Sequence, residues 1–370
     1  MDFELTDEQK ILARTGREFT KRFIPKTLVR ELEDDPTGFR QEVWAEMALL
    51  GWTGWIIPEE YGGVGGSYPD LIALFEELGR ACYLGPFSSS IICTMAILKY
   101  GNEKQKREFL PKVASGEAIF VLAQSEPVAQ TDRDVAQVKA TRVSGGWTIE
   151  GTKLFVPYAH IANWFVCTAQ TSEGIALFLV DAKSTDLSYK LLETLARDKQ
   201  CEVSFNSVKV PEENVLGEAG KGWEIVKNLN QWGALTQCAL ISGVVQQVLE
   251  MSVEYAKERV QFNQPIGSFQ VIQHKCADMM ADVEAVKYLT YLAAWKMNTG
   301  QSAKLEISMA KARASDASRR VCLGGHAVHG GIGITADHDM QIYFRQAKTM
   351  ELAFGNADFH RELVAQHLEL

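Results

Sequence analysis

Arg259 and a cluster of glycines are the residues whose types best suit contact with a phosphate group. A guanidinium presents a fixed fork of N–H donors that matches phosphate oxygens, and Arg259 lies in ERVQFNQPIGSFQ, residues 258–270. Glycines let a backbone approach a ligand closely, and GGHAVHGGIGIT, residues 324–335, is rich in them. Taken alone, such an arginine is also typical of a solvated helix end, and such glycines are also typical of a turn that ends a helix.

The spacing of the histidines and cysteines does not indicate metal chemistry. His326 and His329 are close in sequence, but no third ligand has matching spacing. The seven cysteines are scattered and never spaced as CxxC, which is typical of reduced thiols in a cytoplasmic protein. We therefore expect no metal site, no disulfide framework and a cytoplasmic location.

The elements that must position these residues change twice along the chain. The first stretch has helical periods, and Thr6 with Gln9 fits a capping box at the start of its first helix. Short runs rich in β-branched and aromatic residues then follow one another without helices between them, which favours an antiparallel barrel or sandwich. After Gly217 the helical period returns in long runs. We expect an N-terminal all-α domain over 1–118, a β domain over 119–222 and a C-terminal four-helix bundle over 223–370.

Length and charge exclude several classes of protein. A chain of 370 residues is too long for one simple core. Its net charge of −9 disfavours a general binder of nucleic acid or of acidic membranes, because both need a positive field. No apolar run approaches the roughly 20 residues of a membrane span. The acidic start MDFELTDEQK lacks the apolar region of a secretory signal.

Six motifs in order and spacing resemble the acyl-CoA dehydrogenase family. Each is weak alone, but together they extend over essentially the whole chain. The closest resemblance is to members that act on bulky, cyclic or steroid-side-chain acyl-CoAs. The motifs are PEEYGGVGG (58–66), SEPVAQTD (125–132), KVPEENVLG (209–217), the two segments named above, and FRQAKTMELAFGNADFHREL (344–363).

This resemblance implies a cofactor, a substrate and partners. FAD would bind between the β domain and the C-terminal bundle, in a tetramer arranged as a dimer of dimers. An acyl-CoA substrate would lose a proton from its α-carbon and a hydride from its β-carbon to flavin N5. An electron-transferring flavoprotein would then accept the electrons.

The resemblance also assigns roles to the residues that would hold the ADP half of FAD. Arg259 falls where the family contacts the pyrophosphate. Phe262 and Gln270 fall where it usually meets the adenine end, although both could equally pack a turn of the bundle. The glycines would let the backbone approach the pyrophosphate of the partner subunit's flavin. These glycines are Gly330, Gly331 and Gly333.

The positions expected at the flavin ring depart from the family pattern. Ser125 matches a residue that meets the pyrimidine ring. Phe155 replaces a tryptophan, and it can still supply an aromatic wall. Pro157 replaces a hydrogen-bond donor to flavin N5, although proline has no N–H. Ala327 replaces a glutamine that helps to bind FAD. The elements for ADP are thus mostly present, and those for the flavin ring are altered.

The family's catalytic base is missing from its usual place. General-base help is worth about 10²–10⁴-fold, or about 3–5 kcal/mol. The family carries a glutamate directly before a glycine in its C-terminal segment, and this chain has Phe354–Gly355. Some members place the glutamate on the first bundle helix, where this chain has Gly233 followed by Ala234. The backbone N–H of Phe354 could still donate to the thioester carbonyl.

Three interpretations stay open. In the first, Glu351 is the base, although Arg345 or Lys348 could instead hold it in a structural ion pair. In the second, the chain is the base-lacking subunit of an α2β2 heterotetramer with a paralogous subunit. In the third, other chemistry runs on the same scaffold, with Gln231 and Trp232 facing the substrate. Weaker candidates for the base are Asp337, His338 and Asp358.

The substitutions also bear on the substrate. Phe354, Gly233 and Ala234 remove charged side chains and would leave an apolar pocket, which favours a bulky or ring-bearing acyl group over a short dicarboxylic one. His360 is expected at the surface or in an interface. A role as a scaffold without turnover is the alternative to an enzyme.

Overall fold

The computed structural model describes residues 5–127 and 135–370. Residues 128–132, the end of the SEPVAQTD motif, lie outside the described residues. The chain forms two compact units. The first contains the chain up to Arg30, Tyr68–Tyr83 and Ala234–Leu370, and the second contains Glu31–Ser67 and Leu84–Gly233. The division into domains expected at residues 118 and 222 stays a prediction.

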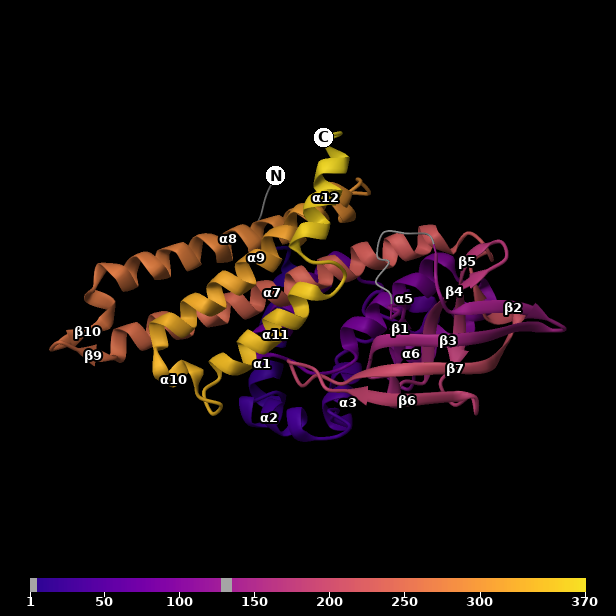
Figure 1. Ribbon diagram of the computed structural model, residues 1–370, viewed down its shortest axis with the longest axis horizontal. Helices are drawn as coiled ribbons and strands as arrows, with labels where there is room; N and C mark the ends of the chain where they lie inside the picture. The colour runs from indigo at the N-terminus through magenta and orange to yellow at the C-terminus, as the bar shows by residue number, and fades with distance from the viewer. Residues whose placement is uncertain (1–4, 128–134) are drawn as a thin grey trace. The chain divides into compact units, whose positions relative to one another are not determined.

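The first unit is helical, as predicted for both ends of the chain. Within it α9 packs against α8, α11 and α12, and Figure 1 shows α8 and α9 side by side. The N-terminal capping box is confirmed, because Thr6 and Gln9 each accept a hydrogen bond from the other's backbone N–H. The helices are α1 (Asp7–Phe23), α4 (Leu71–Ala81), α8 (Gln270–Asn298), α9 (Lys304–His329), α10 (Gly331–Ile334), α11 (Met340–Leu352) and α12 (Ala357–His367), with parts of α2 (Lys26–Asp34) and α7 (Gly222–Glu258).

Two glycines let α4 and α7 cross in backbone contact. A Cβ atom at Gly79 would overlap the carbonyl group of Leu240, and one at Gly243 would overlap that of Glu76. The two substitution-intolerant positions therefore fix the middle of α7 against α4.

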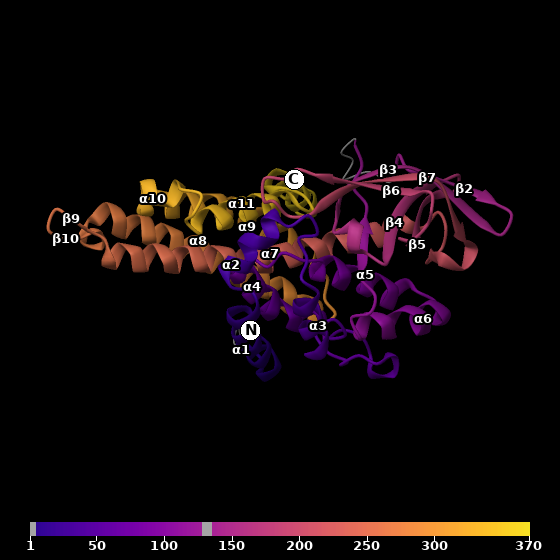
Figure 2. The same ribbon diagram turned by 90° about the horizontal axis from the view of Figure 1, so that it is seen from below.

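The second unit is built on one sheet. The strands follow the order β6-β7-β3-β2-β4-β5-β8, and β1 pairs with β4. Figure 2 shows α5 (Phe87–Tyr100) and α6 (Glu103–Ala114) on one face of this sheet; α3 (Gln41–Leu49) belongs to the same unit. The strands are β1 (Phe120–Ala123), β2 (Lys139–Val143), β3 (Gly146–Pro157), β4 (Trp164–Thr171), β5 (Gly174–Asp181), β6 (Leu187–Leu192), β7 (Gln200–Pro211) and β8 (Val215–Leu216).

The sheet confirms the prediction of mostly antiparallel strands. The exceptions among the described strands are β1 and β2, which both pair with β4 in parallel. The core lies along β4 and β5, whose central residues are buried on both faces. Their sequences are therefore continuous apolar runs instead of alternating ones.

Two β-bulges shift the register between β3 and β7. Between Ile149 and Gly151 the extra residue lies on β7, and between Lys153 and Val156 it lies on β3. The first shift is undone by the second, so the ends of the ladder keep one register and its middle has another. In the described part of the chain, no helix combines the length and apolar character needed to cross a bilayer.

Candidate functional site

In the second unit the structure brings Ser125 and Phe155 together. Ser125 follows β1, and its carbonyl oxygen accepts a hydrogen bond of 2.9 Å from the backbone N–H of Leu154. Phe155 occupies the β3 bulge in a left-handed conformation with φ 54°. Its side chain is 57% exposed. A large aromatic residue rarely adopts this backbone conformation, so an exposed ring held there is a candidate for a functional surface.

A buried lysine, Lys153, contacts the residues on both sides of Ser125. Lys153 is fully buried, and its Nζ donates to the Gln124 carbonyl oxygen at 3.1 Å, to Glu126 Oε1 at 2.7 Å and to Thr168 Oγ1 at 2.8 Å. Because Gln124 and Glu126 flank Ser125, the lysine fixes the segment that carries the serine. Sequence analysis missed this residue. The signal was a lysine inside an apolar strand, close in the chain to an acidic motif.

The first turns of α7 lie in the same unit. Asn230 Oδ1 accepts a 2.8 Å hydrogen bond from Gln124 Nε2, which connects α7 to the segment before Ser125. Trp232 is buried, and the Nζ of Lys99 lies 5.6 Å from the centre of its ring. Gln231 is half-buried beside it. The proposed substrate residues of α7 are therefore anchored to α5 and to the end of β1.

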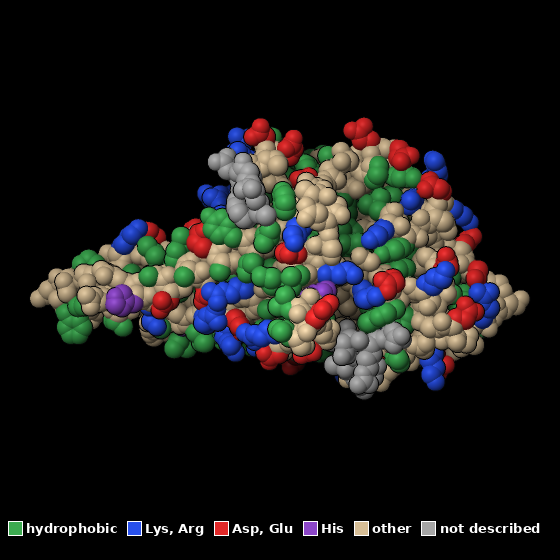
Figure 3. All heavy atoms as spheres, turned by 90° about the horizontal axis from the view of Figure 1, so that it is seen from above, with side chains coloured by type: hydrophobic (Ala, Val, Ile, Leu, Met, Phe, Trp, Pro, Cys, Tyr) green, Lys and Arg blue, Asp and Glu red, His purple; other side chains and the backbone are tan. Residues whose placement is uncertain are grey.

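In the first unit Arg259 opens a hairpin at the end of α7. Its N–H donates to the Tyr255 carbonyl oxygen, and its own carbonyl oxygen accepts from Ile266 N–H. Phe262 and Asn263 both have positive φ, 53° and 61°, which is the conformation of a two-residue type I′ turn between β9 (Val260–Gln261) and β10 (Gln264–Pro265). The Phe262 side chain is 87% exposed. Figure 3 shows hydrophobic side chains at the surface of this end.

The turn at residues 330–333, called the glycine turn, lies at the same end of the first unit (Figure 1). The ring of Tyr255 stacks on that of His329 at 4.6 Å, which joins the end of α7 to the end of α9. Gly330 follows with φ 63° and ψ −140°, a conformation open to glycine. Side chains at 330 and 331 would meet open space, whereas one at Gly333 would crowd His329.

These features fit a phosphate-bearing group. Arg259 and Gln270 are exposed, and the backbone at the glycine turn can be approached without obstruction. Burial lowers the pKa of His326 and of His329, which favours their neutral form. Among the described residues, no group of three His, Cys, Asp or Glu side chains could hold a metal ion.

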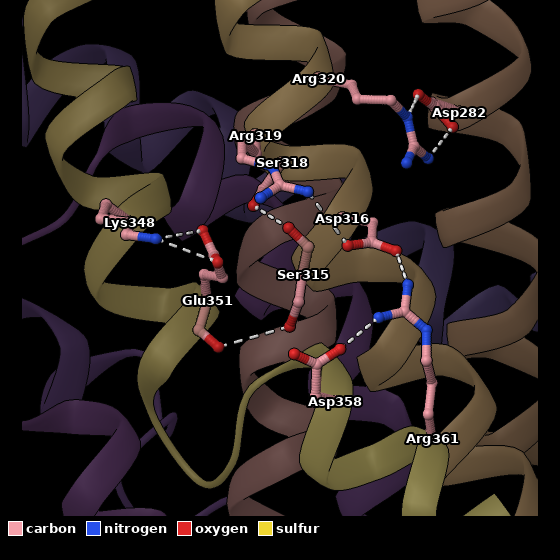
Figure 4. A network of polar contacts seen from close by, with 10 residues as sticks. All are labelled: Asp282, Ser315, Asp316, Ser318, Arg319, Arg320, Lys348, Glu351, Asp358 and Arg361. Atoms are coloured by element: carbon pink, nitrogen blue, oxygen red, sulfur yellow. Dashed lines mark hydrogen bonds and ion pairs between the residues drawn. The ribbon is translucent and has the colours of Figure 1, made fainter.

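Glu351, the candidate base, lies near the end of α11. Both of its carboxylate oxygens are 3.1 Å from the Nζ of Lys348, and its side chain is 13% exposed. Figure 4 shows this pair and, on the other side, the Glu351 carbonyl oxygen facing the hydroxyl of Ser315. The weaker candidates are spread over other elements. Asp337 and His338 precede α11, and Asp358 lies in the first turn of α12.

The turn after α11 contains Phe354 and Gly355, with φ 56° and 97°. Two buried side chains hold it. Lys311 Nζ donates to the carbonyl oxygens of Glu351 and Gly355, and His360 Nε2 donates to that of Phe354. Burial lowers the pKa of Lys311 to about 8 and that of His360 to about 4.

The expected surface position of His360 is wrong, because its side chain is only 4% exposed. Sequence analysis also missed Lys311. A histidine before an arginine in a short helix reads as polar, and nothing in the spacing reveals that a carbonyl oxygen of the preceding turn needs a donor.

The candidate residues thus fall into three groups. Ser125 and Phe155 lie together in the second unit, near the start of α7. Arg259 and the glycine turn share one end of the first unit. Glu351 and Phe354 lie at the end of α11, away from the glycine turn along that helix (Figure 1).

Comparisons with known proteins agree with these motifs. Three family models match consecutive parts of the chain: Acyl-CoA dehydrogenase, N-terminal domain (residues 6–117), middle domain (121–208) and C-terminal domain (220–369). A probable acyl-CoA dehydrogenase of Bacillus subtilis, YngJ, is 32% identical over the full length of both chains.

Two solved structures are similar over nearly their whole length. Butyryl-CoA dehydrogenase from Megasphaera elsdenii has a TM-score of 0.93 and 30% identity, with 100% of each chain covered. A chain of the ChsE4-ChsE5 complex from Mycobacterium tuberculosis has a TM-score of 0.92 and 27% identity, with 100% of this chain and 99% of that chain covered. The chain therefore belongs to the acyl-CoA dehydrogenase family, FAD-dependent oxidoreductases that act on the CH–CH bond of acyl-CoA thioesters.

Proposed function

We propose that this chain catalyses the α,β-dehydrogenation of an acyl-CoA with a bulky or ring-bearing acyl group. The observation that carries the proposal is Phe155, an exposed aromatic ring held at a strained bulge beside Ser125. Such a ring offers a flat apolar wall for one face of a flavin. FAD, when bound, supplies N5 as the acceptor of the hydride that leaves the β-carbon.

The described residues have distinct parts in holding that cofactor. Arg259 would hold the pyrophosphate with its fork of N–H donors, and Gly330 and Gly331 leave their backbone open to the pyrophosphate of the partner subunit's flavin. Phe155 would cover the ring. Pro157 cannot donate to the ring, since it has no N–H.

The thioester needs a polarised carbonyl and a proton acceptor. The backbone N–H of Phe354 is proposed as a donor to the thioester oxygen. Glu351 is proposed as the acceptor of the α-proton. Lys348 donates to both oxygens of Glu351, so a proton taken up by this carboxylate would weaken the ion pair.

Small and apolar side chains support a bulky acyl group. Gly233 and Ala234 follow Trp232 on α7, and Phe354 follows α11. None of these side chains has a charge that could pair with a second carboxylate. A panel of CoA esters in a thermal-shift assay tests this. Greater stabilisation by cyclohexanecarboxyl-CoA than by butyryl-CoA is expected, and a clear preference for glutaryl-CoA would contradict it.

The reaction itself is tested by colour. The purified protein should be yellow, and its flavin absorbance should bleach when the preferred CoA ester is added without oxygen. Glu351→Gln should slow the bleaching by roughly 10²–10⁴-fold. Glu362→Gln is the matched control, because Glu362 is an exposed acid on α12 that is no candidate for the base. Unchanged bleaching in Glu351→Gln eliminates Glu351 as the base, and no bleaching with any ester supports a scaffold role.

The ion pair between Glu351 and Lys348 favours a second candidate function. In this second candidate the pair is structural, and the base comes from another chain of an α2β2 heterotetramer. Similarity to a chain of the ChsE4-ChsE5 complex supports this alternative. Co-expression with a paralogous chain tests it. A protein that is colourless alone and elutes as a yellow heterotetramer with its paralogue would favour the second candidate over the first.

An electron-transferring flavoprotein is the proposed electron acceptor in both cases. The proposal rests on the family resemblance. Reoxidation of the bleached protein by a purified electron-transferring flavoprotein, compared with reoxidation by oxygen, tests this partner.

A further inference from the structure

We propose that Lys311 and His360 are positioning residues, which hold the Phe354–Gly355 turn so that the backbone N–H of Phe354 polarises the thioester carbonyl. This inference rests on the proposed function, since it concerns an acyl-CoA thioester. It assigns the turn a role that does not depend on the side chain at 354.

Lys311 and His360 together are called the clamp, and Lys311 is its first half. It lies on α9 and is fully buried. Its Nζ donates to the carbonyl oxygens of Glu351 at 2.9 Å and Gly355 at 2.8 Å, and to Ser315 Oγ at 3.1 Å. All three N–H groups of the ammonium are therefore used. One side chain ties the last turn of α11 to the far side of the Phe354–Gly355 turn.

His360 provides the second half. It lies on α12, and its Nε2 is 2.9 Å from the Phe354 carbonyl oxygen. Nδ1 is buried and has no hydrogen-bond partner in the part of the chain that the structure describes. The neutral tautomer with hydrogen on Nε2 satisfies this geometry, because a proton on Nδ1 would be left buried without an acceptor. The ring is thus a fixed donor to one peptide group.

The turn is strained, and the clamp explains why it persists. Phe354 has positive φ although it is not glycine. Such a conformation costs about 1–3 kcal/mol and needs support from its surroundings. Gly355 cannot be replaced easily, because a Cβ there would overlap the ring of Phe359.

The clamp engages carbonyl oxygens and leaves one N–H group available. The oxygens of Glu351, Phe354 and Gly355 all accept from buried side chains. Ala353 and Phe354 are the central residues of a turn that the Gly355 N–H closes. Within the described residues, the N–H of Phe354 has no acceptor. A free backbone N–H in such a turn can donate to a negative oxygen.

Infrared spectroscopy of a bound thioester tests the inference directly. The probe is (cyclohexylthio)acetyl-CoA with ¹³C at the thioester carbonyl. Sulfur replaces its β-carbon, so no hydride can leave. In the FAD-loaded wild type the ¹³C=O stretch should move to lower frequency on binding. Lys311→Met should lose most of this shift while still binding the ester.

Matched variants separate positioning from general damage. Lys348→Met removes a lysine that contacts the Glu351 side chain but no turn carbonyl, and it should keep the shift. His360→Leu should lose part of the shift, and His360→Gln should restore it, because its amide can donate to the same oxygen. If Lys311→Met does not fold, the pair of His360 variants decides the question.

The outcomes distinguish the inference from the function on which it rests. A full shift in Lys311→Met and in His360→Leu would overturn the clamp and leave the proposed function intact. A wild type that binds no acyl-CoA would overturn both. If wild type turns over substrate, Lys311→Met should lower kcat by roughly 10²-fold with little change in KM, the lower end of the roughly 10²–10³-fold lost with an oxyanion donor.

Discussion

Two buried lysines support two left-handed phenylalanines, one in each unit, and they do so with different partners. Lys153 lies two residues before Phe155 and bonds to the carboxylate of Glu126. Lys311 donates hydrogen bonds to the carbonyl oxygens of Glu351 and Gly355, on either side of Phe354, and to the hydroxyl of Ser315. The first lysine is half of a buried ion pair. The second is a buried cation whose contacts are all with neutral groups.

The difference shows that the two turns resist change in different ways. A carboxylate that loses its buried cation is left as an isolated charge, which is strongly unfavourable. Carbonyl oxygens that lose a donor remain neutral, and their loss is smaller. The β3 bulge should therefore depend on its lysine for folding, whereas the turn after α11 should depend on its lysine chiefly for shape.

The largest effect is expected for Lys153→Met. It leaves Glu126, whose side chain is 8% exposed, without its cation. Loss of one partner of a buried pair costs about 3–5 kcal/mol. Urea unfolding at a fixed, saturating FAD concentration measures it. Adding Glu126→Gln should recover part of the loss, and a single variant within about 1 kcal/mol of wild type would break the comparison.

Acidification should act on the other turn through His360. Burial lowers the pKa of His360 to about 4, and nearby Lys311 contributes to the shift. As pH falls from 6.5 to 4, the unfolded chain takes up a proton that the folded chain does not, so stability falls. The total is about 3 kcal/mol at 1.36 kcal/mol per pKa unit. His360→Gln should remove this part of the slope, leaving the part due to the other histidines. Equal slopes for the two proteins would contradict it.

Lys311→Met should lower the free energy of unfolding by about 2 kcal/mol, less than Lys153→Met, because it strands only neutral acceptors. The difference from wild type should grow as pH rises from 8 to 10.5. In that range the unfolded wild type still binds the proton that the folded wild type has released, which stabilises its fold. Urea titrations at pH 7 and 9.5 measure both effects. A larger loss than for Lys153→Met would reverse the order.

The smallest effect is expected for Lys348→Met. Its ion pair with Glu351 is partly exposed, with the lysine side chain 40% accessible. Such pairs contribute about 0–1 kcal/mol. A thermal unfolding midpoint close to that of wild type is expected. A loss as large as that of Lys311→Met would mean that the surface pair, and not the buried lysine, supports the turn.

The order of helices and strands could be predicted because it depends on local periodicity. The Thr6 capping box also followed from two residues at fixed spacing. The parallel pairing of β1 with β4 could not, because the partner is more than 40 residues away and both strands are short apolar runs. Burial of Lys153 was missed because a lysine in a strand usually indicates an exposed face, although its place in an apolar strand near an acidic motif was a signal.

Residue types alone singled out part of the candidate site, whose role stays a prediction. Arg259 and the glycines have the chemistry for a phosphate contact, and the glycine at 330 does adopt a positive φ. The left-handed conformations of Phe155 and Phe354 are not recognisable, because bulky residues are rare there. The turn at Phe354 is held by Lys311, which lies 44 residues before its hydrogen-bond partner Gly355, and no local pattern encodes such a distant contact. Whether Glu351 is the base stays a prediction.

The paired bulges of β3 and β7 constrain the number of residues in these two strands as well as their identities. One extra residue on β7 is cancelled by one on β3, so the segment with Lys153 is offset while both ends stay aligned. Deleting Leu154 should misalign everything beyond it and turn Val156 outward. Deleting Ser207 as well should realign the ladder, so a second deletion should act as a suppressor of the first. Insertions and deletions in these strands should therefore be tolerated in pairs.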